Sequence, residues 1–321
     1  MALKQTLVIF DALDSATVTG HTIAEIFEPY NGHGVTVEVR SIKNEPPGDP
    51  AKSTDFITIV IPGTHGKKTG GQARTLGVVG RNGAIGARPA KLGMVSDADG
   101  PIGALAVALK LAQMKANGDA LPGDVIVTTH LSTDAPMSEN NGVPFMGMPV
   151  SSATMNEYEV SAEMDAILSL DASKGNRIVK HRGFALSPTA MQGYILRMAP
   201  DLVAIMESTT GQPAVTFPIS LQDITPYDNG LSHFNSIMQP HVATDKPVVG
   251  VAITARSVVG GSDSSASHEV DLAEAVRFTT EVAKRYTGGA CEFFDASEWQ
   301  KIRSMYPDLT AFQGRGKALH A

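Results

Sequence analysis

The sequence predicts an α/β fold in which a mostly parallel, partly mixed sheet carries helices on both faces. Short apolar runs of strand length alternate along the 321 residues with longer segments of helical periodicity. This alternation is typical of parallel strands joined by covering helices. We find no internal repeat and no interdomain linker, and we therefore expect residues 1–321 to form a single domain.

The composition restricts the classes of protein to which the chain can belong. Hydrophobic residues make up 42% and charged residues 18%, which is ordinary for a globular protein. A net charge of −7 argues against non-specific nucleic-acid binding. Apolar runs such as 247–253 are too short to cross a bilayer. The first residues lack the pattern of a signal peptide, so we expect a cytoplasmic protein.

The first third of the chain contains two helical and two extended patterns. We expect helices at 3–13 and 22–30, and strands at 35–39 and 56–61. Leu3, Leu7 and Phe10 fall at helical spacing and define the expected apolar face of the first helix. The second strand ends at a Pro-Gly-Thr-His turn that contains His65.

The segment from Lys91 to Ala116 indicates a strand, an acidic turn and a helix. Residues 91–95 form a short apolar run, Asp97 and Asp99 follow, and helical periodicity begins after Pro101. One of the two acidic residues can cap the helix. The other is expected at the carboxyl end of a strand, where open α/β sheets bind their ligands.

Glycines recur every third residue just before this segment, at positions 77, 80, 83 and 86. The spacing differs from the dinucleotide-binding fingerprint, and the pattern that follows is a strand rather than a helix. We therefore expect a flexible or tightly turned loop here. The remaining expected elements are strands at 124–129, 164–170, 213–219 and 247–254, and a long helix from Asp271.

Histidine and aspartate side chains follow several of the expected strands. A single such residue usually caps a helix, but several at successive strand ends are expected to converge on one site. Imidazole and carboxylate groups suit two adjacent zinc-like ions. Since Cys291 is the only cysteine, ligation by nitrogen and oxygen is expected, with zinc, manganese or cobalt as the divalent metal. The residues concerned are His65, Asp97, His130, Asp134, Asp171 and His268.

Basic residues cluster between positions 177 and 182 in this acidic chain. Such a cluster is either a solvated face or a site for a substrate carboxylate. The substrate-binding candidates are Arg177, His181 and Arg182.

Several of these segments resemble motifs of the co-catalytic zinc aminopeptidases, the group of glutamyl and tetrahedral aminopeptidases. The similar segments are 59–65, 97–100, 121–125, 165–171 and 267–272. The resemblance implies a zinc-exopeptidase-like fold, and the short segment between His65 and Asp97 implies no separate lid domain. As a whole, the chain is also similar to a family of uncharacterised bacterial and archaeal proteins of about this size.

The resemblance implies a ligand set for two metal ions. His65 and Asp171 would hold one ion, Asp134 and His268 the other, and Asp97 would bridge them.

The resemblance also identifies departures around the metal ligands. Thr133 stands where these enzymes carry their catalytic glutamate, and Lys67 stands where they carry an orienting acid. Thr133 cannot act as a general base. His130, Glu139 and Glu157 are the candidates to replace it.

The leading hypothesis is a metal-dependent hydrolase of amide bonds in small peptides or acylated amino acids. The runner-up is a non-catalytic member of the fold that binds an amino-acid-like ligand or a partner subunit, and a metal-dependent isomerase or lyase is the third. We expect a small-molecule or short-peptide substrate, no nucleic-acid or membrane partner and, by analogy with the resembling enzymes, a homo-oligomer.

Overall fold

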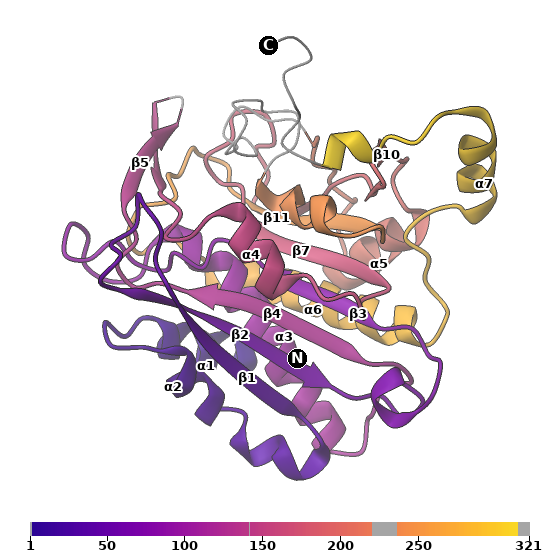
Figure 1. Ribbon diagram of the computed structural model, residues 1–321, viewed down its shortest axis with the longest axis horizontal. Helices are drawn as coiled ribbons and strands as arrows, with labels where there is room; N and C mark the ends of the chain where they lie inside the picture. The colour runs from indigo at the N-terminus through magenta and orange to yellow at the C-terminus, as the bar shows by residue number, and fades with distance from the viewer. Residues whose placement is uncertain (1, 141, 220–235, 314–321) are drawn as a thin grey trace.

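A computed structural model describes residues 2–140, 142–219 and 236–313 (Figure 1). Within these ranges nine strands form one mixed sheet in the order β1-β2-β4-β3-β7-β11-β9-β10, and β8 also pairs with β11. The expected α/β fold is therefore confirmed. The strands of this sheet are β1 (Thr36–Lys43), β2 (Ser53–Ile61), β3 (Leu76–Gly80), β4 (Val125–Leu131), β7 (Ala166–Ala172), β8 (Gly183–Leu186), β9 (Ala190–Met191), β10 (Tyr194–Ile195) and β11 (Val248–Thr254).

Helices cover both faces of the sheet. Helices α1, α3, α5 and α6 contact one another on one face, and α4 and the 3-10 helix η4 pack against the other (Figure 1). The helices are α1 (Leu3–Leu13), α2 (Gly20–Glu25), α3 (Asp99–Ala116), α4 (Ser152–Glu159), α5 (Pro200–Thr210), α6 (Glu269–Thr287) and α7 (Ala296–Met305). A separate hairpin consists of β5 (Met137–Asn140) and β6 (Val143–Met146), and η4 spans Ser236–Ala243.

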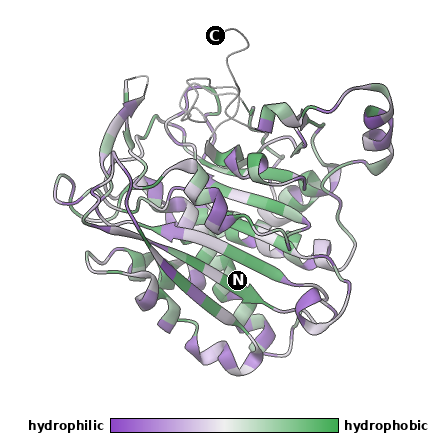
Figure 2. Cartoon of the chain, viewed as in Figure 1, coloured by the Kyte–Doolittle hydropathy of each residue, from purple (hydrophilic) through white to green (hydrophobic). Residues whose placement is uncertain are grey.

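The direction of the strands decides which residues can meet. Strands β4, β3, β7 and β11 are parallel neighbours, so their carboxyl ends share one edge of the sheet. Their residues are almost all buried. Most are also apolar, and Figure 2 shows this hydropathy for the middle of the sheet. Strand β2 runs antiparallel to β4, so the carboxyl end of β2 lies at the opposite edge.

The strand that precedes α3 is not the expected one. Residues 91–95 form no strand, and only Val95 makes an isolated bridge, to Ser264. Of the glycine-containing segment expected to be a loop, Gly77 and Gly80 instead lie in the central strand β3, whereas Gly83 and Gly86 lie outside helices and strands. A Cβ atom on Gly80 would lie 2.7 Å from the Gly100 carbonyl oxygen, so glycine lets α3 approach the sheet closely.

Other boundaries also differ from the expected ones. Helix α2 ends at Glu25, and a 3-10 helix with Pro29 near its start follows over Glu28–His33, in place of one helix at 22–30. The expected strand at 213–219 is reduced to a bridge between Thr216 and Leu186.

Helix α1 has the predicted bounds but buries a different face. Leu3 and Leu7 are about 40% exposed, whereas Gln5 and Ile9 are buried. The side-chain amide of Gln5 donates to Gln113 on α3, so the packing of α1 on α3 selects this face.

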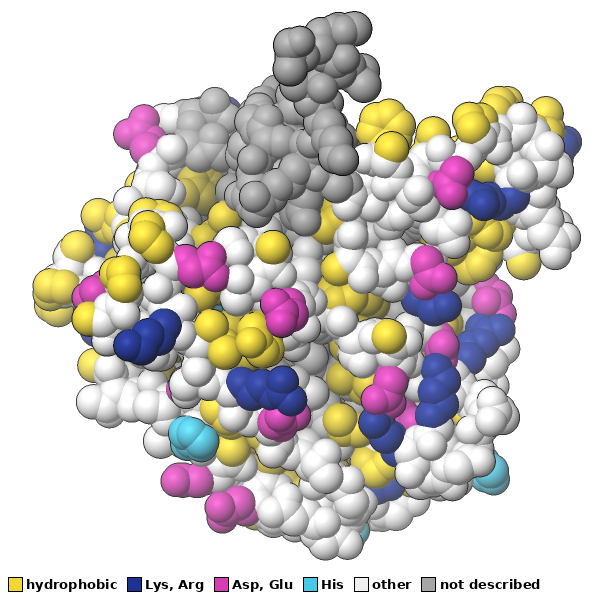
Figure 3. Space-filling view, viewed as in Figure 1, with side chains coloured by type: hydrophobic (Ala, Val, Ile, Leu, Met, Phe, Trp, Pro, Cys, Tyr) yellow, Lys and Arg dark blue, Asp and Glu magenta, His cyan; other side chains and the backbone are white. Residues whose placement is uncertain are grey.

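Acidic and basic side chains are interspersed on the surface shown in Figure 3. None of the helices in the described ranges combines the length and apolar character that crossing a membrane requires.

We predict that Gly80→Ala destabilises the protein by about 1–3 kcal/mol, because the added methyl group would overpack the contact between β3 and α3. Gly32→Ala is the matched control, since a Cβ atom there would meet nothing within 4 Å. The free energy of unfolding of both variants is measured with denaturant. An equal loss in the two variants would contradict the close approach of α3 to β3.

Candidate functional site

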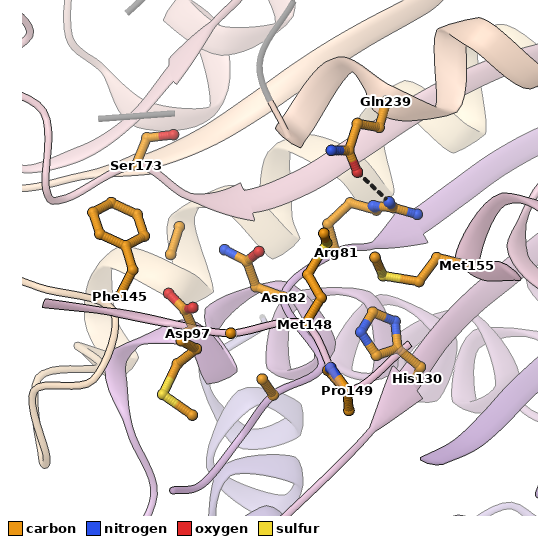
Figure 4. Close-up of a pocket in the computed structure, with 14 residues that line it drawn as sticks. Arg81, Asn82, Asp97, His130, Phe145, Met148, Pro149, Met155, Ser173 and Gln239 are labelled. Atoms are coloured by element: carbon orange, nitrogen blue, oxygen red, sulfur yellow. Dashed lines mark hydrogen bonds between the residues drawn. The ribbon is translucent and has the colours of Figure 1, made fainter. Parts of the chain in front are cut away.

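A small cavity lies at the carboxyl edge of the parallel strands (Figure 4). Its volume is about 40 Å³, which is room for only a few water molecules. Polar residues come from the chain after β3 and after β7, from β4, from the turn before α3 and from η4. Apolar residues come from β6, α4 and the chain between them. Its lining includes Arg81, Asn82, Asp97, His130, Phe145, Met146, Met148, Met155, Ser173 and Gln239.

A buried network joins Arg81, Glu159 and His130 beside the cavity. Arg81 Nη1 donates to Glu159 Oε2 at 2.6 Å, and His130 Nδ1 lies 2.5 Å from Glu159 Oε1. The three side chains are at most 2% exposed. Burial raises the pKa of Glu159, but its interactions with His130 and Arg81 outweigh burial and lower that pKa below its usual value. Glu159 is therefore held as a carboxylate.

A second buried ion pair lies at the tip of β7. Lys174 Nζ is 2.6 Å from Asp99 Oδ2, and both side chains are at most 1% exposed. The same ammonium group donates to the Ala266 carbonyl oxygen at 2.7 Å. The positive charge of Lys174 and the negative charge of Asp99 thus neutralise each other inside the protein.

Asp97 differs from these carboxylates because it forms no ion pair within the described ranges. Its side chain is buried, and its backbone N–H donates to the Gly261 carbonyl oxygen at 3.0 Å. Desolvation and the nearby charge of Asp99 raise the pKa of Asp97 to about 7, partly offset by Lys174 and by a hydrogen bond from the Met146 backbone. The carboxyl group can therefore both accept and release a proton near neutral pH.

Asn82 connects the tips of β3 and β7. Its side-chain amide donates to Asp171 Oδ1. Asn82 has φ of 61°, a left-handed conformation that asparagine adopts more readily than most residues. The sharp turn after β3 places Arg81 and Asn82 side by side at the cavity (Figure 4).

The structure brings together only part of the predicted metal set. Asp97 and His130 line the cavity, and Asp171 is joined to it through Asn82. His65 lies at the opposite edge of the sheet because β2 is antiparallel to β4, and its backbone N–H donates to Pro122, just before β4 begins. The expectation that His65 reaches this site is therefore wrong.

Asp134 and His268 have other partners. Asp134 forms an ion pair with Lys52. His268 is 45% exposed and lies 3.6 Å from Asp271 at the start of α6. Among the residues that the structure describes, no three His, Cys, Asp or Glu side chains form a group able to hold a metal ion. The five predicted ligands thus do not converge.

The predicted glutamate bases lie outside the cavity. Glu139 and Glu157 are exposed, whereas Glu159 on the same helix as Glu157 is buried against His130. Positions 152, 155, 156 and 159 of α4 are buried at helical spacing, but they are Ser, Met, Asn and Glu, so no apolar pattern in the sequence separates Glu159 from Glu157.

The predicted substrate-binding residues do not line the Asp97 cavity. Arg177 is exposed. His181 and Arg182 line a different cavity, of about 350 Å³, together with Arg256 and Glu274. Arg182 Nε donates to Asp271 at 3.0 Å, so its charge is already paired.

The side chains at the cavity do not fit the expected pair of zinc-type ions. Among the described residues that line the cavity, His130 has the only imidazole ring. Both ring nitrogens have hydrogen-bond partners: Nδ1 contacts Glu159, and Nε2 accepts the Gly83 N–H at 3.2 Å. The carboxylates of Asp99 and Glu159 are neutralised by Lys174 and Arg81. Zinc sites use imidazole, thiolate or carboxylate ligands that remain available to the ion. We therefore assign no chemical step to a metal here.

Comparison with known proteins identifies a family and a fold. Residues 47–316 match the family described as "Protein of unknown function (DUF1177)". A mutant of tomato leucine aminopeptidase aligns with a TM-score of 0.53 and 11% identity over 87% of this chain and 60% of that protein. The bottromycin maturation enzyme BotP aligns with a TM-score of 0.49 and 16% identity over 88% of this chain and 70% of that enzyme.

The likeness to the leucine aminopeptidase shows an aminopeptidase-like α/β fold. The chain spans 60% of that protein's length. No curated protein matches the sequence.

We predict that Asp97→Asn stabilises the protein at pH 8 relative to the parent but has little effect near pH 4. The folded state binds the Asp97 proton more tightly than the unfolded state, so stability falls as pH rises from about 4 to about 7. The effect is about 1.4 kcal/mol for each unit of pKa difference. Thermal unfolding of both proteins across this range measures it, and parallel stability curves would contradict the assignment.

Lys174→Met is expected to destabilise the protein by about 3–5 kcal/mol, because it leaves the Asp99 carboxylate buried without its counter-charge. Combining it with Asp99→Asn should restore most of the loss. Denaturant unfolding of the single and double variants tests this pairing, and additive losses would argue against it.

We also predict that a chelator leaves the melting temperature of the parent protein unchanged. A bound metal stabilises the folded state by mass action, so its removal would lower the melting temperature. Retention of a divalent ion on purification, followed by destabilisation on chelation, would contradict our assignment of the site.

Proposed function

The chain belongs to the family described as "Protein of unknown function (DUF1177)", and we propose that it hydrolyses an amide bond of a small peptide or acylated amino acid. The observation that carries this proposal is the buried carboxyl group of Asp97 on the cavity wall, without an ion-pair partner in the described ranges. The aminopeptidase-like fold supports the same class of reaction.

Asp97 would act as the general base and then as the general acid. Its carboxylate takes a proton from a water molecule as the water oxygen attacks the amide carbonyl carbon. The carbon–nitrogen bond then breaks, and the same proton passes to the leaving amine, so one water molecule is consumed. A pKa near the working pH suits a group that must do both.

The network around Glu159 would position the cavity wall rather than take part in proton transfer. His130 is a predicted catalytic residue, but its ring contacts both Glu159 and the Gly83 backbone. We therefore propose a positioning role for His130.

Zinc, manganese or cobalt would polarise the carbonyl group in an enzyme with the expected metal ligands. The proposed hydrolysis does not depend on such an ion.

A second candidate function is binding of an amino-acid-like ligand without catalysis. It is favoured by the pairing of Arg81 with Glu159 and of Lys174 with Asp99, since paired charges hold the site rigidly and leave fewer groups available for chemistry. Three further expectations from the sequence remain predictions: a small-molecule or short-peptide substrate, a homo-oligomeric state and a cytoplasmic location.

We expect the parent protein to hydrolyse members of a panel of dipeptides, amino-acid amides and N-acyl amino acids, detected by mass spectrometry. Asp97→Asn should lower kcat/KM by a factor of about 10² or more, because it removes the proton acceptor. In the parent, kcat/KM should rise with pH through about 7 as Asp97 ionises.

Glu157→Gln is the control variant, since Glu157 is an exposed carboxylate of α4. It should retain parental activity. Absence of hydrolysis across the panel, or full activity of a folded Asp97→Asn variant, would overturn the proposed reaction.

A further inference from the structure

The orientation of the Gln239 side chain is fixed by Arg81. Gln239 lies on η4 and is 1% exposed. Its Oε1 atom accepts a hydrogen bond from Arg81 Nη2 at 2.7 Å. A guanidinium group only donates hydrogen bonds, so the amide oxygen must face Arg81 and the amide nitrogen must point away from it.

The amide nitrogen of Gln239 has no hydrogen-bond partner among the described residues. The Nε2 atom is buried, and Gln239 lines the cavity. Figure 4 shows Oε1 directed at Arg81 and Nε2 on the other side of the amide group. Buried donors are nearly always satisfied, so an unpartnered one beside a cavity indicates a place for a ligand acceptor.

Arg81 is itself held rigidly, which keeps this donor in place. Its Nη1 atom donates to Glu159 at 2.6 Å and to Asn156 at 3.4 Å. A donor fixed in this way need not reorganise when a ligand oxygen arrives.

Asp97 provides an acceptor elsewhere on the same cavity. In Figure 4 the Asp97 carboxyl group lies at the lower left of the view and the Gln239 amide at the upper right. Apolar side chains of Phe145, Met148 and Met155 complete the wall. The cavity thus offers one fixed donor, one anionic acceptor and apolar surroundings.

We propose that this cavity binds the polar head of a small α-amino carbonyl compound. Gln239 Nε2 donates to the carbonyl oxygen, and one oxygen of the Asp97 carboxylate accepts from the ammonium group, which leaves the other oxygen for the proton transfer of the proposed hydrolysis. Amino-acid amides and the amino-terminal residue of a short peptide have this chemistry. The binding inference rests on the unpartnered Gln239 amide nitrogen and on the place of Asp97 in the same cavity lining, and the naming of such compounds as substrates rests on the proposed hydrolysis.

The test compares two probes of similar shape, L-alaninamide and isopropylamine. Both carry an ammonium group, but isopropylamine lacks the carbonyl oxygen. Dissociation constants measured by NMR titration of the parent protein should favour alaninamide by about tenfold, the effect of one well-placed hydrogen bond. A parent protein that binds both probes equally, or that binds neither, overturns the inference.

Gln239→Glu is the matched variant because it keeps an oxygen for Arg81 and replaces the amide donor with a second oxygen. This variant should bind alaninamide and isopropylamine with about equal dissociation constants. Gln212→Glu, at an exposed glutamine, should keep the parental preference. A folded Gln239→Glu variant that still prefers alaninamide overturns the inference, whatever the result with Gln212→Glu.

Ammonia release from alaninamide is measured in the same samples. If the parent shows the Gln239-dependent preference but releases no ammonia from alaninamide, the binding inference stands and alaninamide is not a substrate. Hydrolysis by the parent together with loss of the preference in Gln239→Glu supports both proposals.

Discussion

Neutralisation of buried charge is the constraint on which the whole site depends. The carboxyl edge of the parallel strands gathers carboxylates and cations away from water, where an unpaired charge is costly. Arg81 is paired with Glu159, and Lys174 with Asp99, at 2.6 Å in each case. The first pair also links the chain after β3 to α4, and the second links the chain after β7 to α3.

The pairing explains why two polar groups at the cavity differ from the rest. Asp97 is left without an ion-pair partner in the described ranges, and burial together with the nearby charge of Asp99 raises its pKa to about 7. The Gln239 amide nitrogen is left without a hydrogen-bond acceptor because its oxygen is committed to Arg81. Asp97 and Gln239 both line one cavity, and the proposed reaction and the proposed ligand rest on this combination of a titratable carboxyl group and an unpartnered donor.

The same charges account for the departure from the expected metal centre. The sequence resemblance implied imidazoles from His65 and His268, but neither lines this cavity. Two buried cations, Arg81 and Lys174, lie at this edge of the sheet instead, each paired with a carboxylate that a metal would otherwise attract. Asp171 lies near the carboxyl end of β7 as predicted, whereas Asp97 reaches the same edge of the sheet from the turn before α3 rather than from a strand end.

The sequence alone determined the α/β fold, most strand and helix positions, and the acidic turn at Asp97, because these depend on local apolar periodicity and turn residues. Tertiary structure decided the rest. Periodicity does not give strand direction, so it could not place His65 at the far edge of the sheet. Nor could it show that Gly77 and Gly80 allow β3 to lie against neighbouring elements, since close packing depends on residues distant in the chain. Burial and pairing likewise distinguish Glu159 from Glu157, because the charge state of a carboxylate depends on the groups that the fold brings beside it.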